Sequence, residues 1–360
     1  MKNTYKISAG ILLITLLISC EENLDRVPIS NLTTGNYYQT EAHMEAAMAG
    51  MYNGMRDLFS YHKPQLAQSA SDNTTQLYMK FQEGTLGISQ YVTTTTNYVV
   101  LDYWQAAYQA IYRCNVLIEK SENVEFSDPA LKERYVGEAR FLRALVYFDM
   151  VRFFGGIPLM TELIPLEETY QIGRASKEEV WALIKEDLNA AIMLLPENDP
   201  SGRATKYAAL GILADVHLNL GEYEGSKKAI DQVISSGNYE LFEDFAEVYN
   251  DANNNGPHSI FAIQFLNQPG EGNSYPTLQA PKFISVDQWP FAGGGNRLIP
   301  SQNLWDAYGA EDIRRDLSIK DSFIDGTDGQ VYNEFWQCKH GISNTPIAAE
   351  VWGINQIVMR

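Results

Sequence analysis

The chain has 360 residues, of which 45% are hydrophobic and 12% aromatic, so it can bury a sizeable core. Its formal net charge is -18, from 45 acidic and 27 basic side chains. This balance argues against nucleic-acid binding, because phosphate contacts depend on Lys and Arg, and against docking on anionic lipid through a basic patch. A neutral ligand is indifferent to the charge.

The N-terminus reads as a secretory signal peptide over residues 1–19. Lys2 and Lys6 supply its positive start, and the apolar stretch 7–18 is too short for a comfortable transmembrane helix. It ends in Leu17-Ile18-Ser19-Cys20, which resembles a bacterial lipobox, although an ordinary signal peptide with an incidental cysteine is the alternative. We predict a diacylglycerol on the Cys20 sulfur and an acyl chain on its amine, because several chains anchor a protein stably where one is marginal.

The segment after the anchor is predicted to be a tether over residues 20–32, followed by a helix over 34–58. Residues 60–98 are polar and turn-rich and show no clear helical period. A connection this long is usually functional or disordered, and its aromatic residues argue against plain disorder. It is the first candidate for a ligand-facing surface.

Strong helical patterns follow over residues 102–121 and 130–154. The second helix has apolar residues almost all round, which predicts burial on most sides. Gly155-Gly156 provides its C-cap, and Pro158 prevents its continuation.

The next helix is predicted to begin after Ser176, with Glu179 at the offset of a capping box, and to end near Leu195-Pro196. Thr205 caps a further helix over 206–220, and a turn leads into another over 223–235. Small residues between these two helices make the pair similar to a tetratricopeptide helix hairpin.

The helical period fades after about residue 250. Residues 259–265 alternate like a short strand, and 266–300 are rich in Gly, Pro, Asn and aromatic residues, which makes them the second candidate for a ligand-facing surface. Cys114 and Cys338 are far apart in sequence and show no CxxC spacing; we expect two free buried thiols rather than a disulfide.

Motifs of catalysis are missing from the sequence. The five histidines show no H-E-x-x-H or paired spacing, no G-x-S-x-G occurs, and Gly293-Gly294-Gly295 lacks the Lys-Ser/Thr of a phosphate loop. Any two of the many carboxylates could be proposed as a glycosidase pair, but sequence alone cannot set their separation. We therefore predict no catalytic residue, no metal site and no cofactor. Arg140, Arg143 and Arg152 could suggest an anion site, but Arg134 with Glu138 at i+4 and Asp149 with Arg152 at i+3 offer local pairing, so we expect a structural role.

Several segments occur in an order that is typical of one protein family. The helix and turn Glu138–Leu159 resemble the signature helix of the SusD/RagB family of outer-membrane nutrient-binding proteins, and Trp104–Asn115 is similar to that family's W-x-x-x-Y-x-x-I-x-x-x-N helix. Arg174-Ala175-Ser176, Gly202–Thr205 and Asp312–Arg315 match further landmarks. Together with the lipobox, the resemblance covers most of residues 20–320.

The resemblance implies a mostly α fold of tetratricopeptide-like helix hairpins, an alpha-alpha superhelix with long irregular loops and a few short strands. The helical region would occupy residues 33–250, and 251–360 would be the loop-rich, ligand-facing part of the same domain. Family chains usually run further, and residues 356–360 look like the start of a family helix, so we expect a chain cut before the final helices.

The family's function implies binding of an oligosaccharide at the cell surface and its delivery to a TonB-dependent outer-membrane transporter, without catalysis. Sugars would stack on aromatic rings and bond to polar side chains. From the two loop regions we select the following candidate ligand residues: Asp72, Asn73, Tyr78, Tyr98, Tyr275, Trp289 and Arg297. The alternatives are peptide capture, as in the RagB branch, a tetratricopeptide-type scaffold that binds only protein, and a surface glycoside hydrolase.

Overall fold

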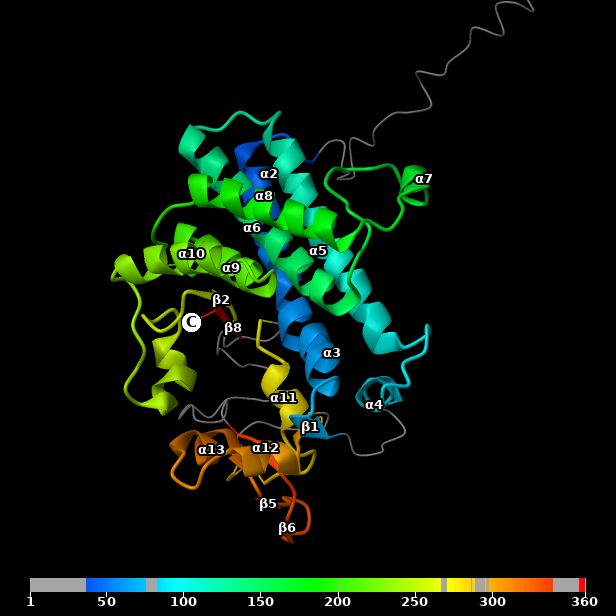
Figure 1. Cartoon of the computed structure of the whole chain (residues 1–360), viewed down its shortest axis with the longest axis vertical. Coiled ribbons are helices and arrows are strands. Elements are labelled where there is room, and N and C mark those ends of the chain that lie inside the picture. The colour runs from blue at the N-terminus through cyan, green and yellow to red at the C-terminus, as the bar shows by residue number, and fades with distance from the viewer. Residues whose placement is uncertain are drawn as a thin grey trace, which may run out of the picture.

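The structure is a computed structural model. It describes residues 37–75, 83–199, 201–266, 271–285, 287–288, 295, 298–338 and 356–359. Figure 1 shows a body of long helices, with most of the shorter helices and strands of the C-terminal third gathered at its lower end. The architecture is therefore mostly α with a few short strands, as the sequence predicts.

The helices and strands have the following bounds. The helices are α2 (Glu41–Asp57), η1 (Leu58–His62), α3 (Lys63–Ser69), α4 (Glu83–Ser89), α5 (Tyr98–Ser121), α6 (Pro129–Phe154), α7 (Leu166–Thr169), α8 (Lys177–Leu194), α9 (Lys206–Asn219), α10 (Tyr223–Ser235), η2 (Phe245–Tyr249), η3 (Asp251–Asn253), α11 (Tyr275–Gln279), α12 (Gln302–Ala307) and α13 (Ile313–Ser318). The strands are β1 (Thr74–Thr75), β2 (Phe261–Ile263), β3 (Ile299–Pro300), β4 (Ile319–Lys320), β5 (Phe323–Ile324), β6 (Val331–Tyr332), β7 (Trp336–Gln337) and β8 (Gln356–Met359).

The first helix differs from the prediction at its start and agrees at its end. Its start at residue 34 is wrong, because Thr40 is the N-cap and accepts a hydrogen bond from the backbone N–H of His43 at 3.3 Å. Its end near residue 58 is confirmed, because α2 ends at Asp57 with Leu58 as its C-cap, but the π-helix η1 then continues the rod directly into α3, which the sequence did not predict. The wider π turn places Pro64, which has no N–H to donate, in the first turn of a new helical segment.

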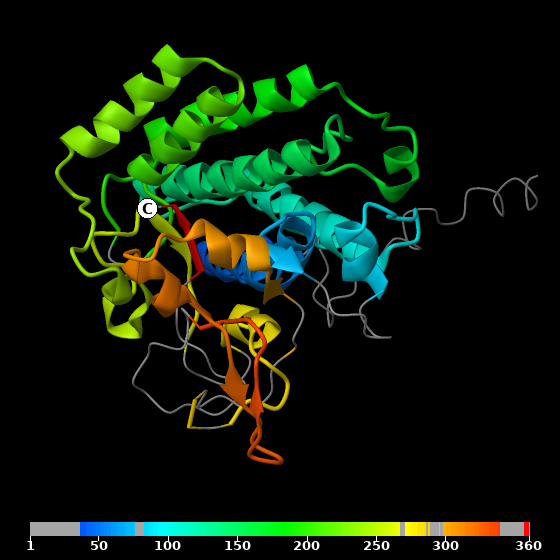
Figure 2. The same cartoon turned by 60° about the horizontal axis from the view of Figure 1, so that its bottom comes forward.

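The longest helix, α6, occupies the centre of the fold. Its residues are buried on almost every side, as its all-round apolar pattern predicts. It packs between α5 and α8, and the three helices share one core with α2 and α9. Figure 2 shows these helices stacked in layers above the C-terminal third. Gly155 ends α6 with a φ of 74°, a conformation that favours glycine, so the predicted C-cap is confirmed.

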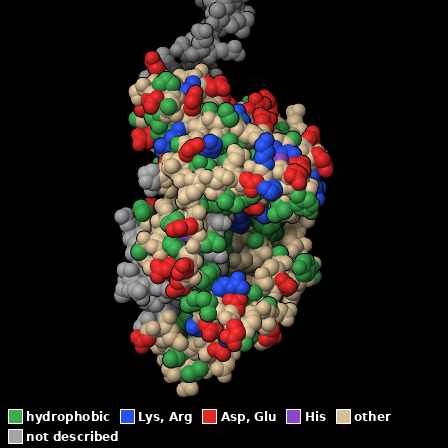
Figure 3. Space-filling model, turned by 60° about the vertical axis from the view of Figure 1, so that its left-hand side comes forward, with side chains coloured by type: hydrophobic (Ala, Val, Ile, Leu, Met, Phe, Trp, Pro, Cys, Tyr) green, Lys and Arg blue, Asp and Glu red, His purple; other side chains and the backbone are tan. Residues whose placement is uncertain are grey.

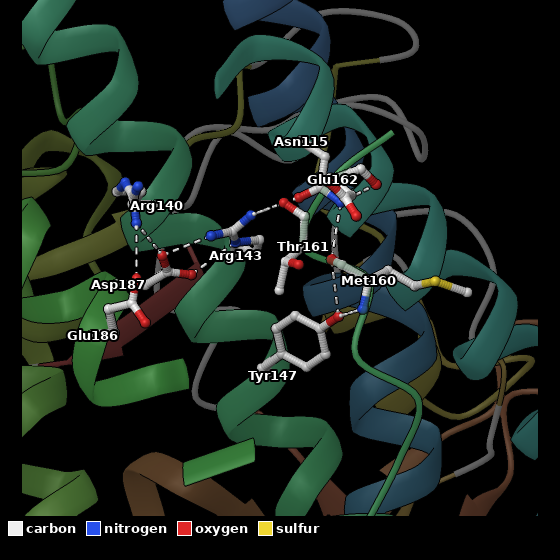
Figure 4. Close-up of polar contacts among 9 residues, drawn as sticks. All are labelled: Asn115, Arg140, Arg143, Tyr147, Met160, Thr161, Glu162, Glu186 and Asp187. Carbon is white, nitrogen blue, oxygen red and sulfur yellow. Dashed lines mark hydrogen bonds and ion pairs between the residues drawn. The ribbon is translucent and has the colours of Figure 1, made fainter. Parts of the chain in front are cut away.

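A buried ion pair joins the three central helices (Figure 4). The guanidinium of Arg143 on α6 donates two hydrogen bonds of 2.7 Å to the carboxylate of Asp187 on α8, and neither side chain is more than 4% exposed. It also donates to the side-chain oxygen of Asn115 on α5 at 2.8 Å and to the carbonyl of Thr161 at 2.9 Å. Arg140 adds a bond to Asp187 at 2.9 Å. The expected local pairs, Arg134 with Glu138 and Asp149 with Arg152, are both present. The pairing of Arg140 and Arg143 with Asp187 was not predicted, and it shows that these two arginines hold helices together.

Helices α8, α9 and α10 form the outer layer, and each begins within one residue of its predicted start. The capping box at Ser176 and Glu179 is present, with reciprocal bonds of 3.2 Å and 2.7 Å. Thr205 caps α9 through the backbone N–H of Ala208 at 3.2 Å. Among the described residues, no helix combines the length and apolar character that crossing a membrane requires.

The C-terminal third is built from short strand pairs. β2 pairs antiparallel with β8, so residues 356–359 form a strand, and the expectation that a helix starts there is wrong. The strand pair β2–β8 packs against the main core around α6. The ring of Phe261 on β2 contacts that of Phe141 on α6 edge to face, with centroids 4.9 Å apart. β4 pairs with β7 and β5 with β6, and these two pairs surround a second small core that includes Trp336 and Cys338.

Both described cysteines are buried thiols outside any disulfide, as predicted. Burial raises the pKa of the Cys114 thiol to about 12, so the reactive thiolate is scarce at neutral pH. We expect Cys114 to resist iodoacetamide at pH 8 in the folded protein and to react readily in urea, as measured by peptide mass spectrometry. Equal labelling rates in both conditions would show that the central helices open far more easily than their packing implies.

Candidate functional site

The two loop regions singled out in the sequence meet at one place in the fold. β1, from the first region, pairs antiparallel with β3, at the end of the second, so that Thr74 lies opposite Pro300 and Thr75 opposite Ile299. More than 220 residues of sequence separate these partners. Although each strand has only two residues, the pairing fixes the polar segment after α3 against the start of α12.

Ser301 reinforces this junction in two directions. Its backbone N–H donates to the carbonyl of Asn73 at 2.9 Å, and its hydroxyl donates to the carbonyl of Asp72 at 2.6 Å. The same hydroxyl oxygen accepts from the backbone N–H of Leu304 at 3.1 Å, which caps α12. One side chain thus sets the position of the loop and the start of the helix that carries Trp305.

An aromatic platform lies beside the junction. The rings of Trp305 on α12 and Phe335 are stacked, with centroids 5.1 Å apart and an interplanar angle of 29°. The guanidinium of Arg315 on α13 lies 4.8 Å from the centre of the Trp305 ring. Arg315 also donates to the carboxylate of Asp316 at 2.8 Å, which lowers the pKa of that carboxyl. The platform is therefore held in place from two helices and the segment before β7.

A cavity of about 420 Å³ lies beside this platform and is lined by its Phe335, while Trp305 is not among the lining residues. Its lining residues are Thr75, Ile299, Pro300, Ser301, Gln302, Asn303, Glu334 and Phe335. An aromatic face, two side-chain amides and the hydroxyls of Thr75 and Ser301 offer both stacking and hydrogen bonding. Among these lining residues, Glu334 carries the only charge. The arrangement suits a neutral polar ligand that presents hydroxyl groups.

Asp72 and Asn73, two of the candidate ligand residues, lie at the edge of this junction. Both residues are exposed, and their carbonyls hold Ser301, which lines the cavity. Their backbone thus has a structural part in the site, while their side chains remain available to a ligand.

Tyr98 and Tyr275 do not line the cavity. Tyr98 begins α5, and its ring lies over α4: a Cβ atom built on Gly84 would be 2.6 Å from it. Tyr275 is 4% exposed and its hydroxyl pairs with the side chain of Gln68, while burial raises its pKa to about 12. The structure thus gives Tyr275 a place in the packing beneath α3 and does not present it at the surface.

Four further predicted residues, Cys20, Tyr78, Trp289 and Arg297, lie outside the described residues, as do the signal peptide and the tether. Their roles in anchoring and ligand binding stay predictions.

With this geometry established, comparison with known proteins is informative. Residues 24–218, more than half of the chain, match the family described as "Starch-binding associating with outer membrane". The chain belongs to the SusD-like family. The family's description names starch binding and association with the outer membrane as properties of the group.

Individual relatives agree with this assignment. The chain is 23% identical over 96% of its length to the SusD-like protein P25 of Formosa agariphila, and 29% identical over 42% of its length to the starch-binding protein SusD of Bacteroides thetaiotaomicron. A laminarin-binding SusD-like protein has the same fold, with a TM-score of 0.77, 23% identity, and coverage of 90% of this chain and 78% of that one. The chain spans 71% of P25 and only 28% of SusD.

Sequence reasoning missed the aromatic pair of this SusD-like protein. The predicted ligand region stopped at residue 300, one residue before the Ser301 cap. The usable signals were an N-capping serine followed by Asn303-Leu304-Trp305, and the adjacent aromatic residues Phe335-Trp336 after a polar turn. Trp336 is buried in the second core, so only Phe335 joins the platform.

The surface charge of this SusD-like protein is spread out. Over the face shown in Figure 3, Asp and Glu side chains are interspersed with Lys and Arg side chains. With a net charge of -18, such a surface offers little attraction to polyanions. Binding of a neutral polymer would depend on local contacts instead of on the net charge.

Proposed function

We propose that this protein binds a neutral oligosaccharide at the cell surface and delivers it, unaltered, to a TonB-dependent outer-membrane transporter. The observation that carries the proposal is the Trp305–Phe335 platform beside a cavity lined by amides and hydroxyls. The family description and the names of the starch-binding and laminarin-binding relatives support the choice of ligand class.

The physics of such a site is simple. The apolar face of a sugar ring packs on an aromatic ring, while its hydroxyls exchange water for amide and hydroxyl partners such as Gln302 and Asn303. Because Ser301 and Arg315 hold the platform in position, less conformational entropy is lost on binding.

Binding without hydrolysis is part of the proposal. Glycosidases use two carboxyl groups on either side of the scissile bond. Glu334 is the only carboxylate among the cavity's described lining residues. A single carboxylate can accept hydrogen bonds from sugar hydroxyls, but it does not supply the acid and base pair.

The test is native gel electrophoresis in gels containing starch or laminarin, with bovine serum albumin as the non-binding standard. The proposal predicts that at least one of the two polymers retards the protein, and that incubated maltohexaose and laminarihexaose stay intact by chromatography. Released shorter sugars would identify an enzyme instead. Retention by neither polymer, together with binding of peptides, would favour the peptide-uptake alternative.

Anchoring through Cys20 has its own test. We expect the mature protein to be found in the outer-membrane fraction, with the mass of a lipid-modified cysteine at its N-terminus, and the Cys20→Ala variant to lose membrane association. Loss is expected because the acyl chains provide the binding free energy, about 0.8 kcal/mol per buried CH₂. An unmodified Cys20 on a protein released into the medium would contradict the anchor.

A further inference from the structure

A second hollow runs along the outer side of α5. It is lined by other residues than those of the platform and its cavity. Its volume is about 830 Å³. The lining residues are Tyr38, Trp104, Gln105, Tyr108, Gln109, Tyr112, Arg113, Pro158 and Met160. We call it the α5 groove. Four of its nine lining residues are aromatic.

The aromatic residues form a regular row. Trp104, Tyr108 and Tyr112 are four residues apart, so they lie on one face of α5 and span about 12 Å along its axis. The first two rings are 5.0 Å apart at 49°. Tyr112 is 48% exposed, so the row ends in an accessible ring.

The row is fixed by its surroundings. Trp104 meets Phe154 of α6 edge to face at 5.1 Å, and the hydroxyl of Tyr108 donates to the carbonyl of Pro158 at 2.8 Å. Rings that are already held in place lose little freedom when a ligand binds.

A polar row runs beside the aromatic one. Gln105, Gln109 and Arg113 follow the same four-residue spacing, one residue further along α5. Arg113 donates to the carbonyl of Gly50 at 2.9 Å, which positions it at the groove's end. Although the chain has 45 acidic side chains, none of the described residues lining this groove is acidic. Aromatic faces beside amides and one guanidinium match a ligand with apolar ring faces and many neutral hydroxyls.

We propose that the α5 groove is a second oligosaccharide-binding site, which holds a short segment of a neutral glycan independently of the Trp305–Phe335 platform. The inference rests on the proposed function for its class of ligand. Two separate sites on one molecule would let it hold a long polymer at two points, so that the effective concentration at the second site is raised once the first is occupied.

The test is fluorine NMR of protein labelled with 5-fluorotryptophan, using the chain without residues 1–20, a deletion that removes no described residue. Six tryptophans give six signals, and Trp104→Phe and Trp305→Phe assign the two of interest. Maltohexaose and laminarihexaose are the probes. We expect one of them to shift the Trp104 signal saturably, both in the parent protein and in the Trp305→Ala/Phe335→Ala variant.

Surface variants keep the test independent of folding. Tyr112→Ala and Gln109→Ala alter exposed residues, and each is expected to weaken the hexasaccharide's effect on Trp104 about tenfold, equivalent to about 1.4 kcal/mol. Tyr223→Ala, which removes a tyrosine 69% exposed on α10, is the matched control and should leave the titration unchanged.

The contradicting outcomes are distinct. A Trp104 signal that stays fixed while the Trp305 signal moves would overturn the second site and leave the proposed function standing. A Trp104 shift that disappears in the platform variant would show propagation from the first site, and it overturns independence. A Trp104 shift caused by deleting residues 21–32 without sugar would show that the tether occupies the groove, and it would overturn the sugar site. No shift of either signal would overturn both proposals.

Discussion

Replacing Asp187 with alanine is expected to lower the free energy of unfolding by about 3–5 kcal/mol, because it leaves a buried charge without its partner. Arg143 is 4% exposed in its side chain and would keep only the neutral oxygens of Asn115 and Thr161. Arg140 would lose its bond to the same carboxylate. Since the pair joins α6 to α8 and, through Asn115, to α5, the loss falls on the centre of the fold (Figure 4).

Urea denaturation followed by circular dichroism measures this loss. The matched control is Asp231→Ala, which removes the exposed i, i+4 partner of Lys227 on α10 and should change stability by less than about 0.5 kcal/mol. If both variants shifted the unfolding midpoint by the same small amount, the central pair would not hold the helices as described.

Replacing Trp305 with alanine is expected to weaken oligosaccharide binding about thirtyfold, equivalent to about 2 kcal/mol, because Trp305 stacks on Phe335, the aromatic residue that lines the cavity. The substitution removes the larger ring of the stacked pair and the surface over which Arg315 lies. Phe335, left without its stacking partner, loses its fixed orientation as well.

Isothermal titration calorimetry with maltohexaose and laminarihexaose measures the dissociation constant of the platform, with the α5 groove weakened by Tyr112→Ala in both proteins compared. Tyr170→Ala, which removes a tyrosine 82% exposed on the surface, serves as the control and should leave affinity unchanged. Unchanged affinity in the Trp305→Ala protein, with its fold intact by circular dichroism, would remove the platform from the binding site.

Local sequence signals explain why the central helices were predictable. The caps at Ser176 and Thr205 and the glycine after α6 depend on interactions between residues close in sequence. A few neighbouring residues therefore determine them. The continuity of the rod α2–η1–α3 could not be predicted in this way. It depends on a π turn that accommodates Pro64, and proline is normally interpreted as the end of a helix.

The candidate site was predictable only in part. Composition indicated two loop regions, and the structure joins them where β1 meets β3. The stacking of Trp305 on Phe335, 30 residues later in the sequence, is not encoded in any short-range pattern. It depends on how the strands between the two residues fold back. Burial likewise depends on the tertiary fold, which is why an aromatic residue such as Tyr275 in a Gly- and Pro-rich segment could be mistaken for a surface residue.

The most direct measurement is a crystal structure of the protein soaked with whichever hexasaccharide shows the higher affinity in titration. We expect an intact oligosaccharide with one sugar ring stacked on the Trp305–Phe335 platform. The hydroxyls of that sugar should lie within hydrogen-bond distance of Gln302 or Asn303. A sugar bound elsewhere while the platform stays empty, or a cleaved sugar in the cavity, would contradict it.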